Sequence, residues 1–210
     1  MIDKSIIFKI IGSLLFIEAL LLLACLFMAI GYQEDDVPAF IITIILTTLT
    51  GIVLRYLGRN ADNNMSRRDA YLVVTLSWII FSFFGTLPFI ISGYIPSFTD
   101  AYFETMSGFT TTGATIIDDI DKLPHGLLFW RSMTQWIGGL GIVFFTTAVL
   151  PSFVGGSVKV FAAESTGPIS SRLHPRLSTG AKWIWVVYLV LTIGCMLSFM
   201  ACGMGWFDSI

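Results

Sequence analysis

Five long apolar stretches, separated by short polar segments, dominate the amino-acid sequence. They run over about residues 6–30, 38–57, 71–95, 127–150 and 183–202. Each is close to the roughly 20 apolar residues that a helix needs to cross the hydrocarbon core of a bilayer. The pattern therefore predicts an all-α polytopic membrane protein.

The composition supports a membrane protein and excludes several other classes. Hydrophobic residues make up 55% of the 210 positions and charged residues only 12%, whereas a soluble domain carries about a quarter charged residues. This low charge content excludes a disordered chain, a nucleic-acid-binding arm and an ordinary globular enzyme. The lipid bilayer is the expected partner of the apolar surface, and no nucleic acid is expected.

The lysines and arginines predict the orientation of the chain. If the N-terminus is cytoplasmic and each stretch crosses once, ten of the twelve fall on the inner side: Lys4, Lys9, Arg55, Arg59, Arg67, Arg68, Lys159, Arg172, Arg176 and Lys182. Cytoplasmic segments carry such an excess of positive charge. The orientation requires residues 96–126 to begin and end on the outer side.

Residues 98–117 are too apolar for a solvated loop and too polar for a helix that faces lipid. Asp100 is expected to cap a helix to about Ser107, which at 1.5 Å per residue is roughly 12 Å long and reaches only halfway into the membrane. Gly108 is expected to end this helix. The small residues that follow, 110–115, have weak helix propensity. A short helix and an irregular return segment predict a re-entrant loop.

Irregular backbone at membrane depth is tolerated only where protein or a water-filled cavity adjoins it. Carbonyl oxygens that point into such a cavity can replace the hydration shell of an alkali cation. Gly113 permits the backbone conformation that directs successive carbonyls to one side. A re-entrant helix followed by a threonine–glycine strand, between two membrane spans, is typical of the pore unit of a potassium channel.

Two motifs resemble one family of transport proteins. Residues 103–115 read FETMSGFTTTGAT, which resembles the first filter of Trk-type potassium uptake proteins in the Trk/Ktr/HKT superfamily. Residues 130–142, WRSMTQWIGGLGI, resemble the start of the second pore helix in the same family. The LHPR sequence at residues 173–176 is also similar to a cytoplasmic motif of the family.

The resemblance implies which atoms bind the ion. The first filter would present the backbone carbonyls of Thr111, Thr112, Gly113 and Ala114, with Thr110 and Thr115 adjacent to them. Potassium would be bound only at these carbonyls, as the transported substrate, and no covalent cofactor is expected. A glycine at position 113, where plant-like members often have serine, is associated in the family with potassium preference.

The resemblance also implies the division of the chain. Family members carry four pore units around one central pore. Residues 1–66 would form two N-terminal membrane helices, as in the Trk branch, and residues 67–150 the first pore unit. Residues 151–182 would form a cytoplasmic loop, and residues 183–210 the incomplete start of a second pore unit. The chain is therefore expected to be the N-terminal portion of a longer transporter in the bacterial cytoplasmic membrane.

Two protein partners follow from the same resemblance. One is a cytosolic regulatory ring that binds nucleotide, for which the surface at Lys159, Arg172, His174 and Arg176 would be available; positive-inside bias explains these charges equally well. The other is a second copy of the transporter, because the full-length form is expected to be a homodimer.

Two alternatives to a potassium-uptake function stay open at this stage. The chain could be a non-conducting truncated or assembly module of a cation transporter. It could also be a membrane enzyme in which a threonine of residues 110–115 is the nucleophile and His125 or Glu104 the base, although no oxyanion donor recurs at an interpretable spacing.

Three further features have more than one interpretation. Glu104 could attract cations or could be a buried acceptor that braces the short helix. Glu18, an acid within the first span, is a functional candidate by its position, but a packing role is favoured. Gly138, Gly139 and Gly141 are expected to allow close helix packing, with the short helix as the neighbour.

Overall fold

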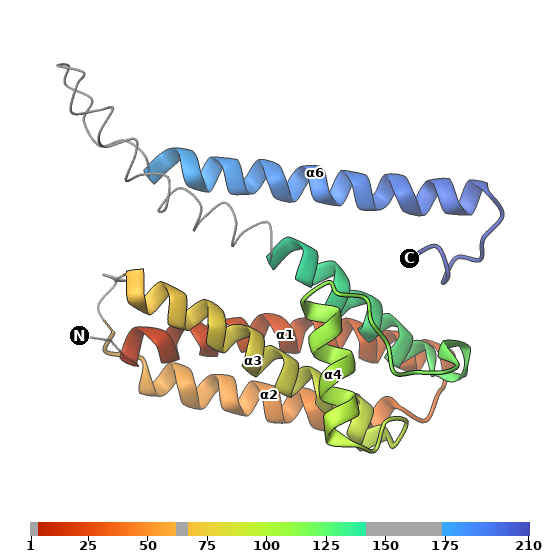
Figure 1. The fold of residues 1–210 in the computed structure, drawn as a ribbon, viewed down its shortest axis with the longest axis horizontal. Helices are drawn as coiled ribbons and strands as arrows, with labels where there is room; N and C mark the ends of the chain where they lie inside the picture. Colours follow the sequence, from red (N-terminus) through yellow and green to blue (C-terminus); the bar gives the residue numbers. More distant parts are fainter. Residues whose placement is uncertain (1–3, 62–66, 142–173) are drawn as a thin grey trace. The chain divides into compact units, whose positions relative to one another are not determined.

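Helices form most of the part of the chain that the structure describes. The computed structural model describes residues 4–61, 67–141 and 174–210 (Figure 1). Its elements are α1 (Lys4–Tyr32), α2 (Val37–Leu57), α3 (Arg67–Ser92), α4 (Phe98–Phe109), η1 (Ile120–Lys122), an unlabelled helix that begins at residue 125 and is described to residue 141, and α6 (His174–Ala201). No strand occurs among these residues, so the prediction of an all-α protein is confirmed.

Four of the described helices are long and apolar enough to span a membrane. They comprise Lys4–Tyr32, Val37–Leu57, Tyr71–Ser92 and Trp183–Ala201. Four of the five predicted spans are thereby confirmed. The remaining one, 127–150, is described only as far as residue 141, where it is helical.

The helices differ from the predicted spans in two places. α3 begins at Arg67 and ends at Ser92, with Pro88 inside the helix. α6 begins at His174, well before the predicted span. α6 belongs to a second compact unit, Leu140–Ile210, which is separate from the unit of residues 1–139.

α1 and α2 form a tightly packed antiparallel hairpin. A Cβ atom added at Gly12 would lie only 2.8 Å from the Arg55 nitrogen and the Gly51 oxygen, and one at Gly58 would lie 2.6 Å from the Ser5 oxygen. Glycine at these positions lets the two backbones approach closely, as small residues do in membrane helix pairs.

α3 packs against this hairpin and runs parallel to α1 (Figure 1). At one end of the bundle, Ile7 and Ile11 of α1 share a cluster with Val73 near the start of α3. At the other end, Phe40 at the start of α2 clusters with Phe89 near the end of α3. The basic residues of α1, α2 and α3 therefore lie towards one end, and the acidic α1–α2 turn lies at the opposite end.

The turn between α1 and α2 buries one of its three acidic side chains. Asp36, directly before α2, is fully buried, and its two carboxylate oxygens have no hydrogen-bond partner among the described residues. Burial and the neighbouring Glu34 carboxylate raise the pKa of Asp36 from 3.8 to about 6. The ionised form of Asp36 is therefore costly in the folded protein.

We expect the substitution Gly12→Ala to destabilise the hairpin, because the added methyl group would force backbones apart. Overpacking of this kind costs about 1–3 kcal/mol. Gly31→Ala is the matched control, since a Cβ at Gly31 meets nothing within 4 Å. Thermal unfolding in detergent should show a lower midpoint for Gly12→Ala only. Equal midpoints for the two variants would contradict the close contact.

A second prediction concerns pH. The pKa of Asp36 is higher in the folded than in the unfolded chain, so its contribution favours folding below about pH 4 and is lost as the pH rises through 6. Asp36→Asn should therefore raise stability at pH 7.5, by up to roughly 3 kcal/mol, and the gain should vanish near pH 4. Thermal unfolding of the wild-type protein and of Asp36→Asn between pH 4 and 7.5 measures this difference in stability. A difference that grows on acidification would contradict the raised pKa of Asp36.

Candidate functional site

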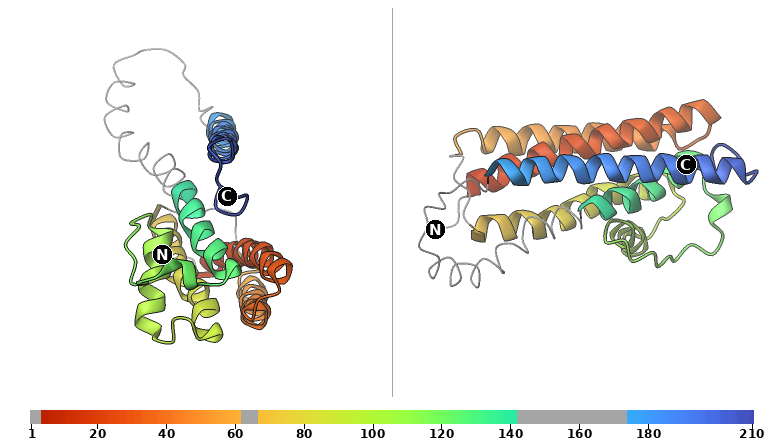
Figure 2. Two further views of the ribbon diagram at one scale, coloured as in Figure 1. Left: turned by 90° about the vertical axis from the view of Figure 1, so that its right-hand side faces the viewer. Right: turned by 90° about the horizontal axis from the view of Figure 1, so that it is seen from above.

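The predicted short helix exists as α4 and lies across the long helices. In Figure 1 α1, α2 and α3 run lengthwise while α4 crosses them steeply, and in the right-hand view of Figure 2 α4 is seen nearly end-on. Its 12 residues correspond to roughly 18 Å, well short of the bilayer core. Its N-cap is Ser97, whose side chain accepts a hydrogen bond from the Asp100 N–H at 3.5 Å. The prediction that Asp100 is the cap was therefore wrong.

α4 is anchored by α3 and by the helix that begins at residue 125. Trp130 is fully buried, and its indole N–H donates to the Gly85 carbonyl oxygen at 2.8 Å. A Cβ added at Gly85 would lie 2.8 Å from the Thr105 side chain and 3.1 Å from Phe109. The glycine in α3 thus lets α4 sit directly on the helix backbone.

The C-terminal end of α4 packs closely against the helix that begins at residue 125. A Cβ at Gly138 would overlap the Phe109 carbonyl oxygen, and one at Gly108 would overlap the Thr134 hydroxyl. The predicted packing role of Gly138 beside the short helix is confirmed. Gly108 does not end α4, which continues to Phe109. It is instead the point at which α4 meets its neighbour.

The chain reverses direction directly after α4. The N–H of Thr111 donates to the Gly108 carbonyl at 2.9 Å, and that of Thr112 donates to the Ser107 carbonyl at 3.0 Å. This pair of bonds is a Schellman motif, in which the residue after the cap is left-handed and usually glycine. Here it is Thr111, with φ +56°. A β-branched residue in this conformation is strained by about 1–2 kcal/mol.

After the reversal an extended segment runs back along α4. Ser107 Oγ donates to the Ala114 carbonyl oxygen at 2.6 Å, which fixes the start of this segment against the helix. Gly113 has φ +74°, and a Cβ added there would meet nothing within 4 Å. Glycine is thus required at 113 for its backbone conformation and not for space. The whole run of residues 111–116 is solvent-exposed in this chain.

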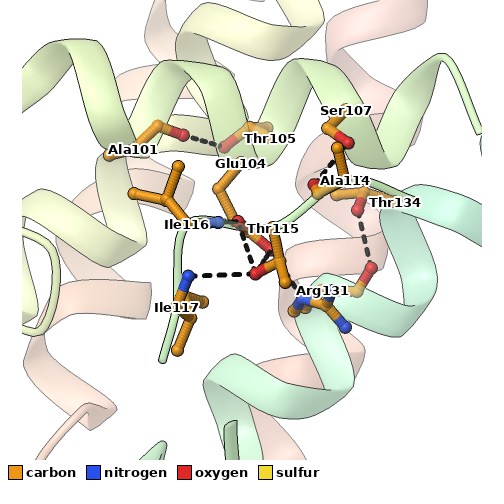
Figure 3. A network of polar contacts seen from close by, with 10 residues as sticks. All are labelled: Ala101, Glu104, Thr105, Ser107, Ala114, Thr115, Ile116, Ile117, Arg131 and Thr134. Atoms are coloured by element: carbon orange, nitrogen blue, oxygen red, sulfur yellow. Dashed lines mark hydrogen bonds and ion pairs between the residues drawn. The ribbon is translucent and has the colours of Figure 1, made fainter. Parts of the chain in front are cut away.

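One buried carboxylate holds the extended segment and the following helix to α4 (Figure 3). Glu104 is 3% exposed. Its Oε2 accepts hydrogen bonds from Thr115 Oγ1 at 2.9 Å and from the Ile116 N–H at 3.1 Å. Its Oε1 forms a 2.6 Å ion pair with Arg131 Nε. Of the two interpretations of Glu104, bracing of the short helix is the one that these contacts support.

The residues predicted to bind the ion thus lie together on one exposed strip. The hydroxyls of Thr110 and Thr112 are 2.8 Å apart, Thr110 also donates to the Met106 carbonyl, and Thr115 is bound to Glu104. The Ala114 carbonyl already accepts one hydrogen bond from Ser107. A carbonyl has two lone pairs, so one remains at Ala114.

Other candidate residues lie away from this strip. His125 contacts Glu34 of the α1–α2 turn through its ring and its backbone N–H. Glu18 is 1% exposed within α1, and neither carboxylate oxygen has a hydrogen-bond partner in the part of the chain described. Of the predicted cytoplasmic segment, Lys159 and Arg172 lie outside the described residues.

Comparison with known proteins gives consistent matches. A family model described as TrkH, cation transport protein, matches residues 36–205. The Trk system potassium uptake protein TrkH of Halomonas elongata is 37% identical over 206 residues, which cover 97% of this chain and 43% of that protein. TrkH of Escherichia coli K12 is 38% identical over 184 residues, 87% of this chain and 38% of that protein.

A solved structure matches the fold over the whole chain. The crystal structure of the potassium transporter TrkH from Vibrio parahaemolyticus superposes with a TM-score of 0.83 at 35% identity, and covers 100% of this chain and 42% of that one. The chain therefore spans about two fifths of the length of the relatives that it matches.

We expect Glu104→Gln to destabilise the protein strongly, because it leaves the partly buried Arg131 guanidinium without its counter-charge. Removal of one partner of a buried ion pair costs about 3–5 kcal/mol. Adding Arg131→Gln to Glu104→Gln should recover part of the lost stability, and a double-mutant cycle measured by thermal unfolding tests this. The exposed pair Asp119–Lys122 is the control, and Asp119→Asn should change stability little. Strictly additive losses for Glu104→Gln and Arg131→Gln would contradict the coupling.

Proposed function

The chain belongs to the TrkH family of cation transport proteins, and we propose that it forms the N-terminal portion of a potassium uptake transporter, including its first pore unit. Members of this family are transport proteins and not enzymes, so the enzyme alternative is abandoned. The observation that carries the proposal is the exposed strip 111–116, which Glu104 holds at the side of a short helix.

The proposed orientation places the N-terminus in the cytoplasm. The start of α1, the end of α2 and the start of α3 share one end of the bundle and carry Lys4, Lys9, Arg55, Arg59 and Arg68. Lysine and arginine are enriched on the cytoplasmic side of membrane proteins. The acidic α1–α2 turn is then on the outer side.

In this orientation α4 and the extended segment form a re-entrant loop. Tyr94, just after α3, donates to Asp35 at 3.2 Å, and His125, at the start of the next helix, contacts Glu34 at 2.7 Å. The segment between them thus leaves and returns at the outer end. α4 is too short to cross, and the strip 111–116 would lie at membrane depth beside the ion path, which is where exposed backbone is tolerated.

The carbonyl oxygens of Thr111, Thr112, Gly113 and Ala114 are the proposed ligands of dehydrated potassium. Thr111 and Gly113 both have left-handed conformations, and glycine at 113 permits the backbone conformation that directs successive carbonyls to one side. Oxygen dipoles of this kind replace the hydration shell of an alkali cation. Thr110 and Thr115 would adjoin the two ends of this set, and no acidic side chain needs to touch the ion.

The proposal for the whole transporter goes further than this chain. The remaining filter segments would come from the rest of the transporter or from other copies. The full-length form would be a homodimer in the bacterial cytoplasmic membrane. A cytosolic nucleotide-binding ring would bind near residues 151–182. A non-conducting assembly module is the alternative, and ion flux decides between them.

The function is tested in a chimera in which this chain replaces the matching part of the Vibrio parahaemolyticus transporter, reconstituted in liposomes. We expect Gly113→Ala to lower the preference for potassium over sodium by roughly tenfold or more, equivalent to about 1.4 kcal/mol of lost ion binding. The cause is the positive φ, which alanine does not readily adopt. Competition of each cation with rubidium uptake measures the preference.

Gly93→Ala provides a matched control. Gly93 also has a positive φ, +80°, and a Cβ there also meets nothing within 4 Å, but it lies in the turn between α3 and α4. The two substitutions impose a similar backbone cost, and only Gly113→Ala should alter ion preference. A wild-type chimera without flux would favour the assembly module. Unchanged preference in Gly113→Ala would refute the filter assignment.

A further inference from the structure

The helix that begins at residue 125 has no capping side chain of its own. Pro124 occupies the cap position and carries no acceptor in its side chain, and the first helical bond runs from the Leu128 N–H to the Pro124 carbonyl at 2.9 Å. The N–H groups of the first turn therefore need acceptors from elsewhere.

The acceptor comes from the α1–α2 turn, far away in the sequence. Glu34 Oε2 accepts a hydrogen bond from the His125 N–H at 2.6 Å, and Oε1 lies 2.7 Å from the His125 ring nitrogen Nδ1. The Tyr32 ring stacks on the His125 ring, with centroids 3.8 Å apart and planes at 5°. A carboxylate at a helix N-terminus also interacts favourably with the helix dipole.

The same turn and the end of α1 pack directly against the helix start. A Cβ added at Gly126 would overlap the Asp36 carboxylate and would lie 2.9 Å from Ala29. On its other side the turn is bonded to the end of α3, where the Tyr94 hydroxyl donates to Asp35. The turn therefore contacts both ends of the segment that contains α4 and the exposed strip.

We propose that Glu34 is a positioning residue for the ion path, because it caps the helix that carries Arg131 and thereby fixes the Arg131–Glu104–Ile116 contacts at the strip. The N-terminal hairpin then has a role in ion selection and is not only a membrane anchor. This inference rests on the proposed function. The helix start is fixed by Glu34, the helix places Arg131, and Arg131 and Glu104 place the extended segment.

The test uses the chimera described above and compares three substitutions. Glu34→Ala removes the cap, Glu34→Gln keeps the shape and one acceptor but not the charge, and Asp35→Asn removes a charge from the same turn without touching the helix start. We expect Glu34→Ala to lower the preference for potassium over sodium by roughly two- to tenfold, Glu34→Gln to lower it less, and Asp35→Asn to leave it unchanged. The preference is a ratio and does not depend on how much protein is inserted.

The outcomes separate the two proposals. If Gly113→Ala alters the preference and Glu34→Ala does not, the positioning role of Glu34 is wrong and the filter stands. If neither alters it, the filter assignment itself fails. An equal effect of Asp35→Asn would overturn the capping argument, because charge alone would then be responsible.

Amide hydrogen exchange on the purified 210-residue chain provides a readout that needs no ion flux. Glu34→Gln, which preserves the shape of the side chain, should accelerate exchange at the N–H groups of His125 and Ile116, with no change in α6. Unchanged exchange at both positions would overturn the inference.

Discussion

The buried carboxylate of Glu104 is the interaction on which the arrangement of the candidate site depends. It joins three elements that are separate in the sequence: α4, which carries it, the extended segment at Thr115 and Ile116, and the following helix at Arg131. An irregular segment whose residues are exposed cannot be held by burial of its own side chains. Its position is therefore set by polar contacts to a rigid neighbour, and a charged acceptor makes these contacts stronger than neutral ones.

Glycines create the second constraint, because the elements around α4 approach each other at backbone distance. Gly85 receives α4 on one side and Gly138 receives its C-terminal end on the other. Close backbone approach compensates for the weak hydrophobic driving force between helices in lipid. These contacts hold the short helix on two sides. The exposed strip that follows the helix is therefore held in a fixed position. Such a fixed geometry suits the proposed filter, whose carbonyl oxygens would replace the hydration shell of the ion.

Much of this arrangement could be predicted from sequence and some could not. Hydropathy predicted the spans because burial in lipid leaves a strong, local signal, and the short helix followed from the mixed polarity of residues 98–117. Its cap was misplaced because Ser97 and Asp100 are both good capping residues, and only the backbone decides between them. The contacts of Glu104 with Arg131 and of Glu34 with His125 join distant positions, so no local pattern indicates them. The role of Gly108 was missed for the same reason, since its neighbour Thr134 belongs to another helix.

We propose that the backbone oxygens of residues 111–114 bind the transported ion. Anomalous diffraction from crystals of the chimera soaked in thallium or rubidium tests it most directly, because both ions substitute for potassium and scatter anomalously. We expect an anomalous peak beside the carbonyls of Thr111, Thr112, Gly113 and Ala114, which potassium removes in competition and sodium does not. An anomalous peak at acidic side chains, with none beside this strip, would contradict it.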